Sequence, residues 1–343
     1  MDTCCAPLLL RSNRSLLTGT APIDRLVSTA GEYGASALAL TDRNNLYGAI
    51  PFYKKAREAG LKPVLGAEIT ACGRRAVALA RNMEGYANLC RLLSRRNLRD
   101  DFELTAELAR CRRGLHILTD DVELAGQLAG RVERGRLWLL LRHPVRRRGE
   151  WRTIQDAARE LDVPVAATPD VYMAGAGEHE VHRTLAAVRM NAVVSELDEN
   201  ADVAHPDAYF PPPERVEKVF ADHPGALENA AGILQDCDLE LPLGRPIFPP
   251  CSVPDGETPR SYLRRLCRRG LKERYHPVPD EARERLEKEL RVIDELGFTE
   301  YFIVVWDILE YARREDIPTI GRGSGASSIV SYVLRIPQAA PLK

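Results

Sequence analysis

The sequence predicts an α/β fold, in which short buried strands alternate with amphipathic helices. Apolar runs of three to five residues recur through the first 200 residues. Segments with apolar residues three or four positions apart separate these runs, as expected for helices with one buried face. Strands that alternate with helices favour a parallel sheet covered by helices, either open or closed into a barrel. In such folds the functional groups gather on loops at the carboxyl ends of the strands.

The elements of this first part follow in chain order. Strands are expected at residues 36–40, 63–65, 76–80, 115–118, 137–141 and 163–167. Helices are expected at 46–59, 85–95 and 151–161, and in the second of these Leu89, Leu92 and Leu93 form the apolar face. The segment around His179 and His182 has helical character, and these two histidines are three positions apart.

The composition changes after residue 204, where four prolines between 206 and 213 indicate a linker or a domain edge. We therefore predict one domain over 1–205 and a second, mostly helical region over 206–343. Helices are expected at 214–238, 258–275, 280–296 and 301–314. In 280–296, Asp280 is expected to cap the helix and Gly297 to end it in a left-handed conformation.

Composition and charge exclude several classes of protein. The net charge is −1, so any nucleic-acid-binding surface must be local. The eight cysteines form no CxxC pair, which argues against a zinc or dithiol site and favours free thiols in a reducing compartment. The N-terminus lacks the features of a secretory signal, and no apolar run approaches the roughly 18 residues of a membrane span. We therefore expect a cytoplasmic protein.

A glycine-rich turn at 321–325 separates a predicted short strand, 318–320, from an apolar run, Ile329–Leu334, that can form a helix. Glycines let the backbone approach a ligand, and turn amides donate hydrogen bonds to anions. Arg322 and Ser324 add a fixed charge and a hydroxyl. The turn is therefore a candidate phosphate-binding loop, although it lacks the GK[ST] ending of a Walker A loop. A purely structural turn remains open at this point.

Two basic clusters are candidates for contact with a nucleic-acid backbone. In the helix expected at 258–275, a cationic face is formed by Arg264, Arg265, Arg268, Arg269 and Lys272. A solvated face balanced by the acidic helix at 280–296 explains it as well. Arg142, Arg146–Arg148 and Arg152 form the second cluster, and an exposed loop without function is favoured there.

The C-terminal part resembles the start of the palm in C-family DNA polymerases, the alpha subunits of bacterial DNA polymerase III. Phe298–Ile308 leading into Ile320–Ser328 carries this resemblance, together with Phe220–Asn229, Pro254–Thr258 and Tyr262–Tyr275. The N-terminal half resembles the PHP domain of the same family, through Ser15–Gly19, Ala39–Asp42, Leu46–Ala49, Val64–Glu68 and Leu79–Tyr86. The resemblance implies a PHP-type distorted (β/α) barrel, a helical connection and the start of a nucleotidyltransferase-type palm.

The resemblance also implies a function for the intact protein, which is DNA-directed DNA polymerase activity in replication or error-prone repair synthesis. Arg322, Gly323 and Ser324 would bind the triphosphate of the incoming nucleotide. The palm carboxylates that hold Mg²⁺ would lie beyond residue 343, so this chain is not expected to be active alone. Template-primer DNA, deoxynucleotides, a sliding clamp and other replisome subunits would be its partners, with no membrane. Compact spacing in the PHP half favours the error-prone class.

The PHP metal site is degenerate when compared with the family pattern. The expected His-x-His pair falls on Leu9 and Arg11, and two further histidines fall on Arg43 and Arg75. The expected cysteine falls on Asp121, and the last histidine on Tyr172. Three acids remain, Asp42, Glu68 and Asp170, with Asp121 as a fourth candidate. Because guanidinium groups repel metal ions and pair with acids, we predict an inactive, structural PHP domain without a bound metal.

Two other hypotheses remain open from sequence. In the first, the chain is a standalone, non-catalytic interaction module derived from the polymerase. In the second, it is an active PHP phosphoesterase or 3′–5′ exonuclease. The lost histidines argue against the latter. A structural role is favoured for His179 and His182 over metal binding.

Overall fold

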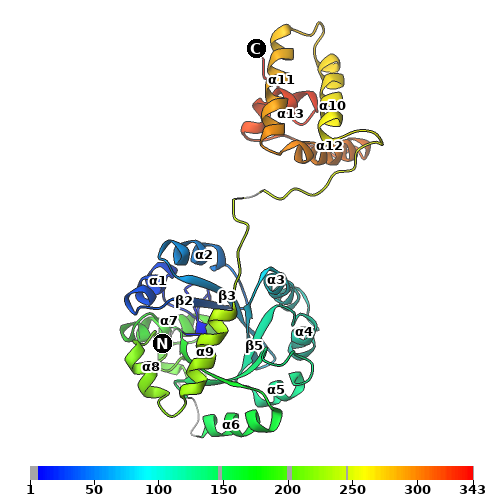
Figure 1. The fold of residues 1–343 in the computed structure, drawn as a ribbon. Coiled ribbons are helices and arrows are strands. Elements are labelled where there is room, and N and C mark those ends of the chain that lie inside the picture. Colours follow the sequence, from blue (N-terminus) through cyan, green and yellow to red (C-terminus); the bar gives the residue numbers. More distant parts are fainter. Residues whose placement is uncertain (1–6, 146–148, 199–202, 245, 343) are drawn as a thin grey trace. The chain divides into compact units, whose positions relative to one another are not determined.

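The computed structural model describes residues 7–145, 149–198, 203–244 and 246–342. The chain forms two compact units, Met1–Leu241 and Pro242–Lys343, and each is described by itself. Figure 1 shows the course of the chain through both.

The first unit is built on a seven-stranded sheet with the order β1-β7-β6-β5-β4-β3-β2. Its strands are β1 (Leu9–Leu10), β2 (Ala37–Arg43), β3 (Lys62–Ala71), β4 (Arg74–Ala80), β5 (Leu115–Thr119), β6 (Leu137–His143) and β7 (Val165–Val171). The two end strands of this order lie side by side. The Thr41 hydroxyl on β2 accepts a hydrogen bond from the Leu10 amide on β1 at 2.9 Å. The sheet is therefore nearly closed into a barrel, as predicted (Figure 1).

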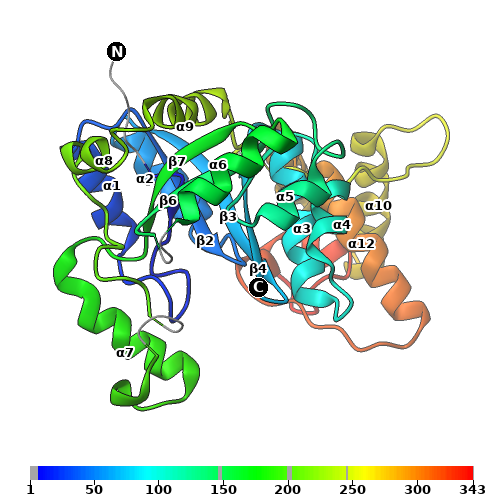
Figure 2. The same ribbon diagram turned by 90° about the horizontal axis from the view of Figure 1, so that it is seen from below.

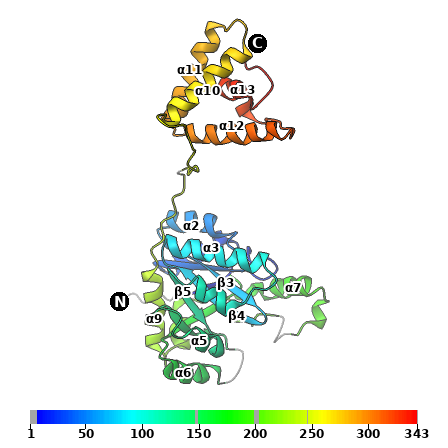
Figure 3. The same cartoon turned by 90° about the vertical axis from the view of Figure 1, so that its right-hand side faces the viewer.

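Nine α-helices of the described residues belong to this unit, and most of them pack on the strands. Figure 3 shows α2 and α3 on one side of the strands and α5 and α6 on the other, and Figure 2 shows α7 projecting from the barrel. The helices are α1 (Ile23–Glu32), α2 (Ala49–Glu58), α3 (Met83–Leu98), α4 (Leu104–Arg110), α5 (Val122–Leu128), α6 (Glu150–Leu161), α7 (His179–Met190), α8 (Pro213–Val219) and α9 (Pro224–Asp236).

The predicted strands and helices of the first 200 residues are confirmed, with one difference in direction. Strand β4 runs antiparallel to both of its neighbours, whereas a parallel sheet was predicted. The reason is the connection: β3 and β4 are joined by Cys72 and Gly73 alone, with φ of 49° and 75°. A two-residue turn in which both residues have positive φ is typical of a hairpin between antiparallel strands. A parallel pair would need a crossover of a dozen residues or more, which two residues cannot supply.

The single helix predicted at 214–238 is wrong, because the chain forms α8 and α9 instead. Pro224 begins α9 at its first turn, where a missing amide proton costs nothing. Helix α9 packs on β7, and the Asn229 side-chain amide donates to the Val165 carbonyl at 2.8 Å. The first unit therefore extends to Leu241, past the boundary predicted between residues 205 and 206.

The second unit is helical, with α10 (Pro259–Arg274), α11 (Asp280–Glu295), α12 (Thr299–Arg314), the short 3-10 helix η3 (Ser324–Ser327) and α13 (Ile329–Val333). Leu266, Cys267 and Leu290 lie in its apolar core. Gly270 of α10 touches α13 so closely that a Cβ atom there would lie 2.0 Å from the Val333 carbonyl oxygen.

Three local predictions in this unit have different outcomes. Gly297 has φ +74°, so the left-handed end of α11 is confirmed. Asp280 is the first residue of α11 and its cap is Pro279, so the predicted capping is wrong. Residues 318–320 form no strand, because they have no paired neighbour in the part of the chain that the structure describes. No described helix is long and apolar enough to cross a membrane.

Candidate functional site

One end of the barrel collects charged side chains from every strand. Four acids and four arginines follow or end the strands there, and β4 contributes at its beginning because it runs in the opposite direction. We call this set the barrel mouth: Arg11, Asp42, Arg43, Glu68, Arg75, Asp120, Arg142 and Asp170.

Arg11 lies at the centre of the barrel mouth and is completely buried. Its Nε and Nη2 donate to the two carboxylate oxygens of Glu68 at 2.9 and 2.8 Å, and its Nη1 donates to Asp170 at 2.6 Å. The guanidinium also lies over the Tyr172 ring, 4.0 Å from its centroid. Burial opposes the charge of Arg11, but Asp170 and Glu68 raise its pKa above the ordinary value. Burial likewise opposes the charge of Glu68, but Arg11 lowers its pKa below the ordinary value.

Asp120 forms a second centre of ion pairing. It accepts from Arg75 Nε and Nη2 at 3.1 and 2.9 Å, and from Arg142 Nε and Nη2 at 2.9 and 2.6 Å. Arg142 also donates to Asp170 at 2.6 Å, which joins the two centres. Asp120 and Arg142 were missed as residues of this site in the sequence. The available signal was their position at the ends of the apolar runs 115–118 and 137–141, two residues and one residue further on.

Two sequence interpretations therefore need correction. Arg142 was grouped with an exposed loop, but it lies near the end of β6 and is 3% exposed. The rest of that cluster, Arg146–Arg148, lies outside the described residues. Asp121 was the candidate fourth acid, but it pairs with Arg74 at 2.9 Å and caps α5 by accepting from the Leu124 amide. The acid of the barrel mouth is its neighbour, Asp120.

Asp42 differs from the other acids because hydroxyl and amide groups hold it. It accepts from the Ser12 amide at 2.8 Å, from the Ser12 hydroxyl at 2.9 Å and from the Ser15 hydroxyl at 2.7 Å. Burial raises the pKa of Asp42 above its ordinary value. The prediction that arginines pair with the remaining acids thus holds for Glu68 and Asp170 but not for Asp42.

The barrel mouth does not fit a divalent metal centre. The guanidinium of Arg11 bridges Glu68 and Asp170, where metal-binding acids would have to converge. Metal ligation also needs anionic oxygen or neutral nitrogen donors, which arginine cannot supply. Within the described ranges, no group of three or more His, Cys, Asp or Glu side chains is arranged to hold a metal ion.

His179 and His182 serve the local structure. His182 Nε2 accepts from the Ala204 amide at 2.9 Å, so its Nδ1 must carry the proton that it donates to the Thr18 carbonyl. His179 Nε2 lies 3.1 Å from the Ala204 carbonyl. Burial lowers the pKa of His182 to about 4. A buried neutral histidine whose two nitrogens are both engaged is not available as a metal ligand.

In the second unit the glycine-rich turn is exposed. Gly323 has φ 85° and ψ −172°, a conformation almost restricted to glycine, and Arg322 and Ser324 lie on either side of it, at least partly exposed. The N-terminus of α13 is already occupied, because Glu289 accepts from the Val330 amide at 3.2 Å and from the Ser328 hydroxyl at 2.7 Å. A phosphate at this turn would therefore depend on the turn itself and on Arg322 and Ser324.

The cationic face of α10 borders a surface groove of about 490 Å³, lined by Ser261, Arg264, Arg265, Arg268, Arg269 and Lys272. Part of its charge is paired. Glu287 on α11 contacts Arg264 at 3.3 Å and Arg268 at 3.0 Å, and Glu257 contacts Arg265 at 2.7 Å. Exposed pairs of this kind are weak and exchangeable. The face is thus both balanced by the acidic helix and able to meet a phosphate backbone.

Comparison with known proteins gives one domain match in each unit. Residues 8–164 match the PHP domain, and residues 261–343 match the bacterial DNA polymerase III alpha NTPase domain. A solved putative metal-dependent phosphoesterase from Bifidobacterium adolescentis is 13% identical, with a TM-score of 0.36 over 48% of this chain and 86% of that one. That likeness is too weak to support an assignment.

Two curated relatives match along nearly the whole chain. An error-prone DNA polymerase from Symbiobacterium thermophilum is 33% identical over 96% of this chain and 34% of its own length. A DNA polymerase III subunit alpha from Halalkalibacterium halodurans is 33% identical over 97% of this chain and 32% of its own length. The chain thus spans about a third of the length of these relatives. It is similar to about the N-terminal third of bacterial DNA polymerase III alpha subunits, with a PHP domain match followed by a match to the NTPase domain.

Proposed function

We propose that this chain is the N-terminal region of a DNA-directed DNA polymerase, whose PHP barrel is an inactive scaffold. The observation that carries the proposal is the order of the two matched domains on one chain, together with relatives that match 96% and 97% of it. The buried guanidinium of Arg11 between Glu68 and Asp170 supports the inactive scaffold. Mg²⁺ would act in the intact protein through carboxylates outside this chain. Sliding clamp and replisome subunits would be its partners, in the cytoplasm.

The glycine-rich turn is proposed to bind the nucleotide triphosphate. Gly323 keeps the backbone open to a ligand, and Ser324 and Arg322 supply a hydroxyl and a cation that solvent can reach. Charge-assisted hydrogen bonds to phosphate oxygens are the strongest kind available to such a turn.

Primer extension by the complete gene product tests this proposal. We expect Ser324→Ala to raise the KM for deoxynucleotides about tenfold, since a hydrogen bond to a charged group is worth about 1.5–3 kcal/mol. Ser327→Ala in the same 3-10 helix is the matched control and should behave like the wild type. A complete gene product that cannot extend a primer would exclude the polymerase, and equal effects of the two variants would exclude the role of Ser324.

The cationic face of α10 is proposed to contact the DNA backbone, through Arg264, Arg265, Arg268, Arg269 and Lys272. We expect the double substitution Arg264→Gln and Arg268→Gln to weaken binding of a primer-template and to reduce the slope of log affinity against log salt by about 2. Arg283→Gln on α11, where Arg283 lies 4.0 Å from Asp280, is the control. An unchanged salt slope in the double variant would contradict the proposed contact.

Inactivity of the PHP barrel is tested by incubating the protein with a single-stranded oligonucleotide and Mn²⁺. We expect no nucleotide release by the wild type and none by Asp42→Ala. If the wild type hydrolyses the oligonucleotide and Asp42→Ala abolishes this activity, then both the inactive scaffold and the lack of a bound metal are wrong.

A further inference from the structure

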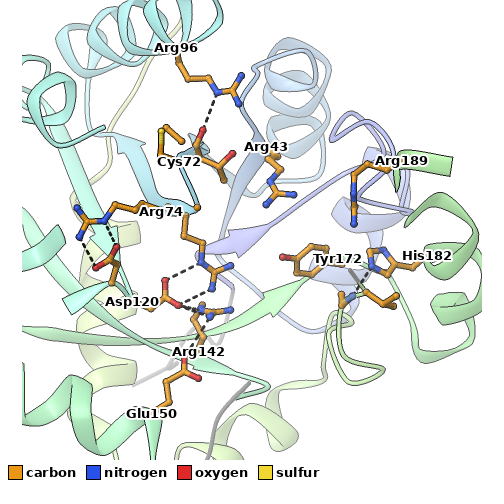
Figure 4. Close-up of a pocket in the computed structure, with 17 residues that line it drawn as sticks. Arg43, Cys72, Arg74, Arg96, Asp120, Arg142, Glu150, Tyr172, His182 and Arg189 are labelled. Carbon is orange, nitrogen blue, oxygen red and sulfur yellow. Dashed lines mark hydrogen bonds and ion pairs between the residues drawn. The ribbon is translucent and has the colours of Figure 1, made fainter. Parts of the chain in front are cut away.

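A pocket of about 680 Å³ lies over the barrel mouth. Six arginines line it against three acids, Asp120, Asp121 and Glu150. The arginines are Arg43, Arg74, Arg75, Arg96, Arg142 and Arg189. Its volume is in the range of pockets that hold small ligands. Figure 4 shows Arg43 and Arg142 approaching the space from different strands, with Tyr172 and His182 to one side.

Several of these arginines already have acidic partners. Arg75 and Arg142 share Asp120, and Arg74 pairs with Asp121 at 2.9 Å and with Glu123 at 3.1 Å. In Figure 4 the Arg74 side chain extends away from Arg43. These three guanidinium groups therefore contribute fixed positive potential to the pocket, but most of their donors are in use.

Arg43 and Arg96 have fewer partners. Arg43 makes one long ion pair, from its buried Nε to Glu68 at 3.5 Å, and its side chain is 36% exposed. No hydrogen bond to the described residues uses its two Nη groups. Arg96 Nε donates to the Thr70 carbonyl and its Nη1 to the Asn97 side chain, both at 3.1 Å. The described part of the chain supplies no carboxylate within salt-bridge distance of Arg96. Both guanidinium groups thus keep donors for another acceptor.

The framework that holds Arg43 and Arg96 is rigid. Asn44, next to Arg43, donates to the Thr70 hydroxyl at 2.8 Å and accepts from the Thr70 amide at 2.9 Å. Thr70 in turn holds Arg96 through its carbonyl. The ends of β2 and β3 and the C-terminal turn of α3 are therefore fixed together. Donors that are held in place before binding lose less entropy when the ligand arrives.

The acids beneath the pocket cancel only part of this charge. Glu68 and Asp170 are buried and paired with Arg11, and Asp170 also accepts from Arg142. The six arginines of the lining and Arg11 still outnumber these two acids and the three acids of the lining by two. A planar guanidinium with spare N–H groups matches the oxygens of a phosphate group, which it binds bidentately. We propose that the pocket binds a phosphoryl anion without any metal, with Arg43 and Arg96 as its main donors. The anion is either free phosphate or the terminal phosphate of a nucleotide chain.

Calorimetric titration of this 343-residue chain with inorganic phosphate, in EDTA and low-chloride buffer, tests the proposal. We expect saturable binding to one site. Arg43→Gln and Arg96→Gln should each weaken it at least about tenfold, the loss expected for one charge-assisted hydrogen bond. Arg43→Lys should retain more affinity than Arg43→Gln. Arg134→Gln removes the same charge before β6 begins, at the other end of the barrel strands, and should leave the affinity unchanged.

Two further ligands distinguish the source of the phosphate. A single-stranded trinucleotide is titrated with and without a 5′-phosphate. Tighter, phosphate-dependent binding of the trinucleotide supports a nucleic-acid end as the ligand, whereas binding equal to inorganic phosphate supports the free anion. Circular dichroism checks that each variant is folded. Arg43 and Arg96 are both half-buried, so if one of the two variants fails to fold, the other still tests the proposal. Absence of saturable binding, a requirement for added Mn²⁺, or an equal loss in Arg134→Gln would overturn the proposal.

Discussion

Arg11 binds Glu68 through two parallel hydrogen bonds of 2.9 and 2.8 Å, with the Arg11 side chain fully shielded from solvent and that of Glu68 only 1% exposed. The same guanidinium donates to Asp170, so one cation bridges two buried carboxylates, and Arg142 supplies a second cation to Asp170. Burying charges is costly, and the cost is recovered only while every partner is present. The ion pairs of the barrel mouth therefore stabilise the fold as a set, because removing one partner leaves a buried charge without compensation.

Replacing Arg11 by methionine should strongly destabilise the first unit. Glu68 and Asp170 would remain buried without their shared partner, and removing one member of a buried pair typically costs about 3–5 kcal/mol. Urea unfolding followed by circular dichroism measures the change. Arg134→Met is the control, since Arg134 is 83% exposed and pairs only at the surface with Asp162. Similar stability of Arg11→Met and the wild type would show that Arg11 does not stabilise the barrel.

Stability should fall as the pH decreases from about 6.5 to about 4, because of two buried histidines. Burial lowers the pKa values of His116 and His182 to about 4, from the ordinary 6.5. Between these values only the unfolded chain binds the proton, so acid favours unfolding. The Ala204 amide donates to His182 and Trp138 donates to His116, so a second proton on either ring would break a hydrogen bond.

Unfolding measured from pH 8 to pH 4 in the wild type and in His182→Gln checks this dependence. The variant should be less stable at pH 8 and should lose less stability towards pH 4. The difference in slope should approach about 1.4 kcal/mol per pH unit at most. His205→Gln is the control, since the His205 side chain is 54% exposed. Parallel curves for the wild type and His182→Gln would contradict the explanation.

More of the fold than of the site could be predicted from the sequence. A buried strand such as 137–141 appears as an apolar run within one short stretch of chain. The direction of β4 depended on a two-residue turn at Cys72 and Gly73, which the run 76–80 does not reveal. Asp120 and Asp121 are adjacent after β5, and the sequence does not reveal that Asp120 pairs with Arg75 and Arg142 whereas Asp121 caps α5. Arg142 could have been found, because it directly follows a predicted strand.

The same limit holds for the acids of the barrel mouth. We predicted only that Arg11, Arg43 and Arg75 pair with the remaining acids, because they replace ligands in the metal-site pattern of the family that the sequence resembles. Which arginine meets which acid was not predicted. The separate environment of Asp42 depends on Ser12 and Ser15, whose hydroxyls approach only when β1 and β2 lie side by side. Contacts of this kind follow from closure of the barrel and leave no local pattern in the sequence.

Gly270→Ala should destabilise the second unit by about 1–3 kcal/mol, the usual cost of overpacking. A Cβ atom at Gly270 would overlap the Val333 carbonyl, and backbone atoms cannot move aside cheaply. The matched control is Gly232→Ala in α9, where nothing lies within 4 Å of the new Cβ. That substitution should stabilise the first unit by about 0.5–1 kcal/mol, because alanine favours helix. Thermal unfolding measures both, and a neutral Gly270→Ala would mean that α10 and α13 are not packed this closely.

Gly323→Ala should change the conformation of the glycine-rich turn, whereas Gly325→Ala should leave it intact. With φ 85° and ψ −172°, Gly323 occupies a region from which a Cβ atom excludes other residues, at a cost of about 1–3 kcal/mol. Gly325 has no positive φ, and a Cβ atom added there would meet no atom within 4 Å, so alanine fits. Because the turn is exposed, it can relieve the strain by rearranging, and the global stability should change little. Amide chemical shifts of residues 321–328 report the rearrangement. In the complete gene product, the proposed triphosphate site requires nucleotide affinity to fall for Gly323→Ala alone. Equal chemical-shift changes in both variants would show that the turn does not require glycine at this position.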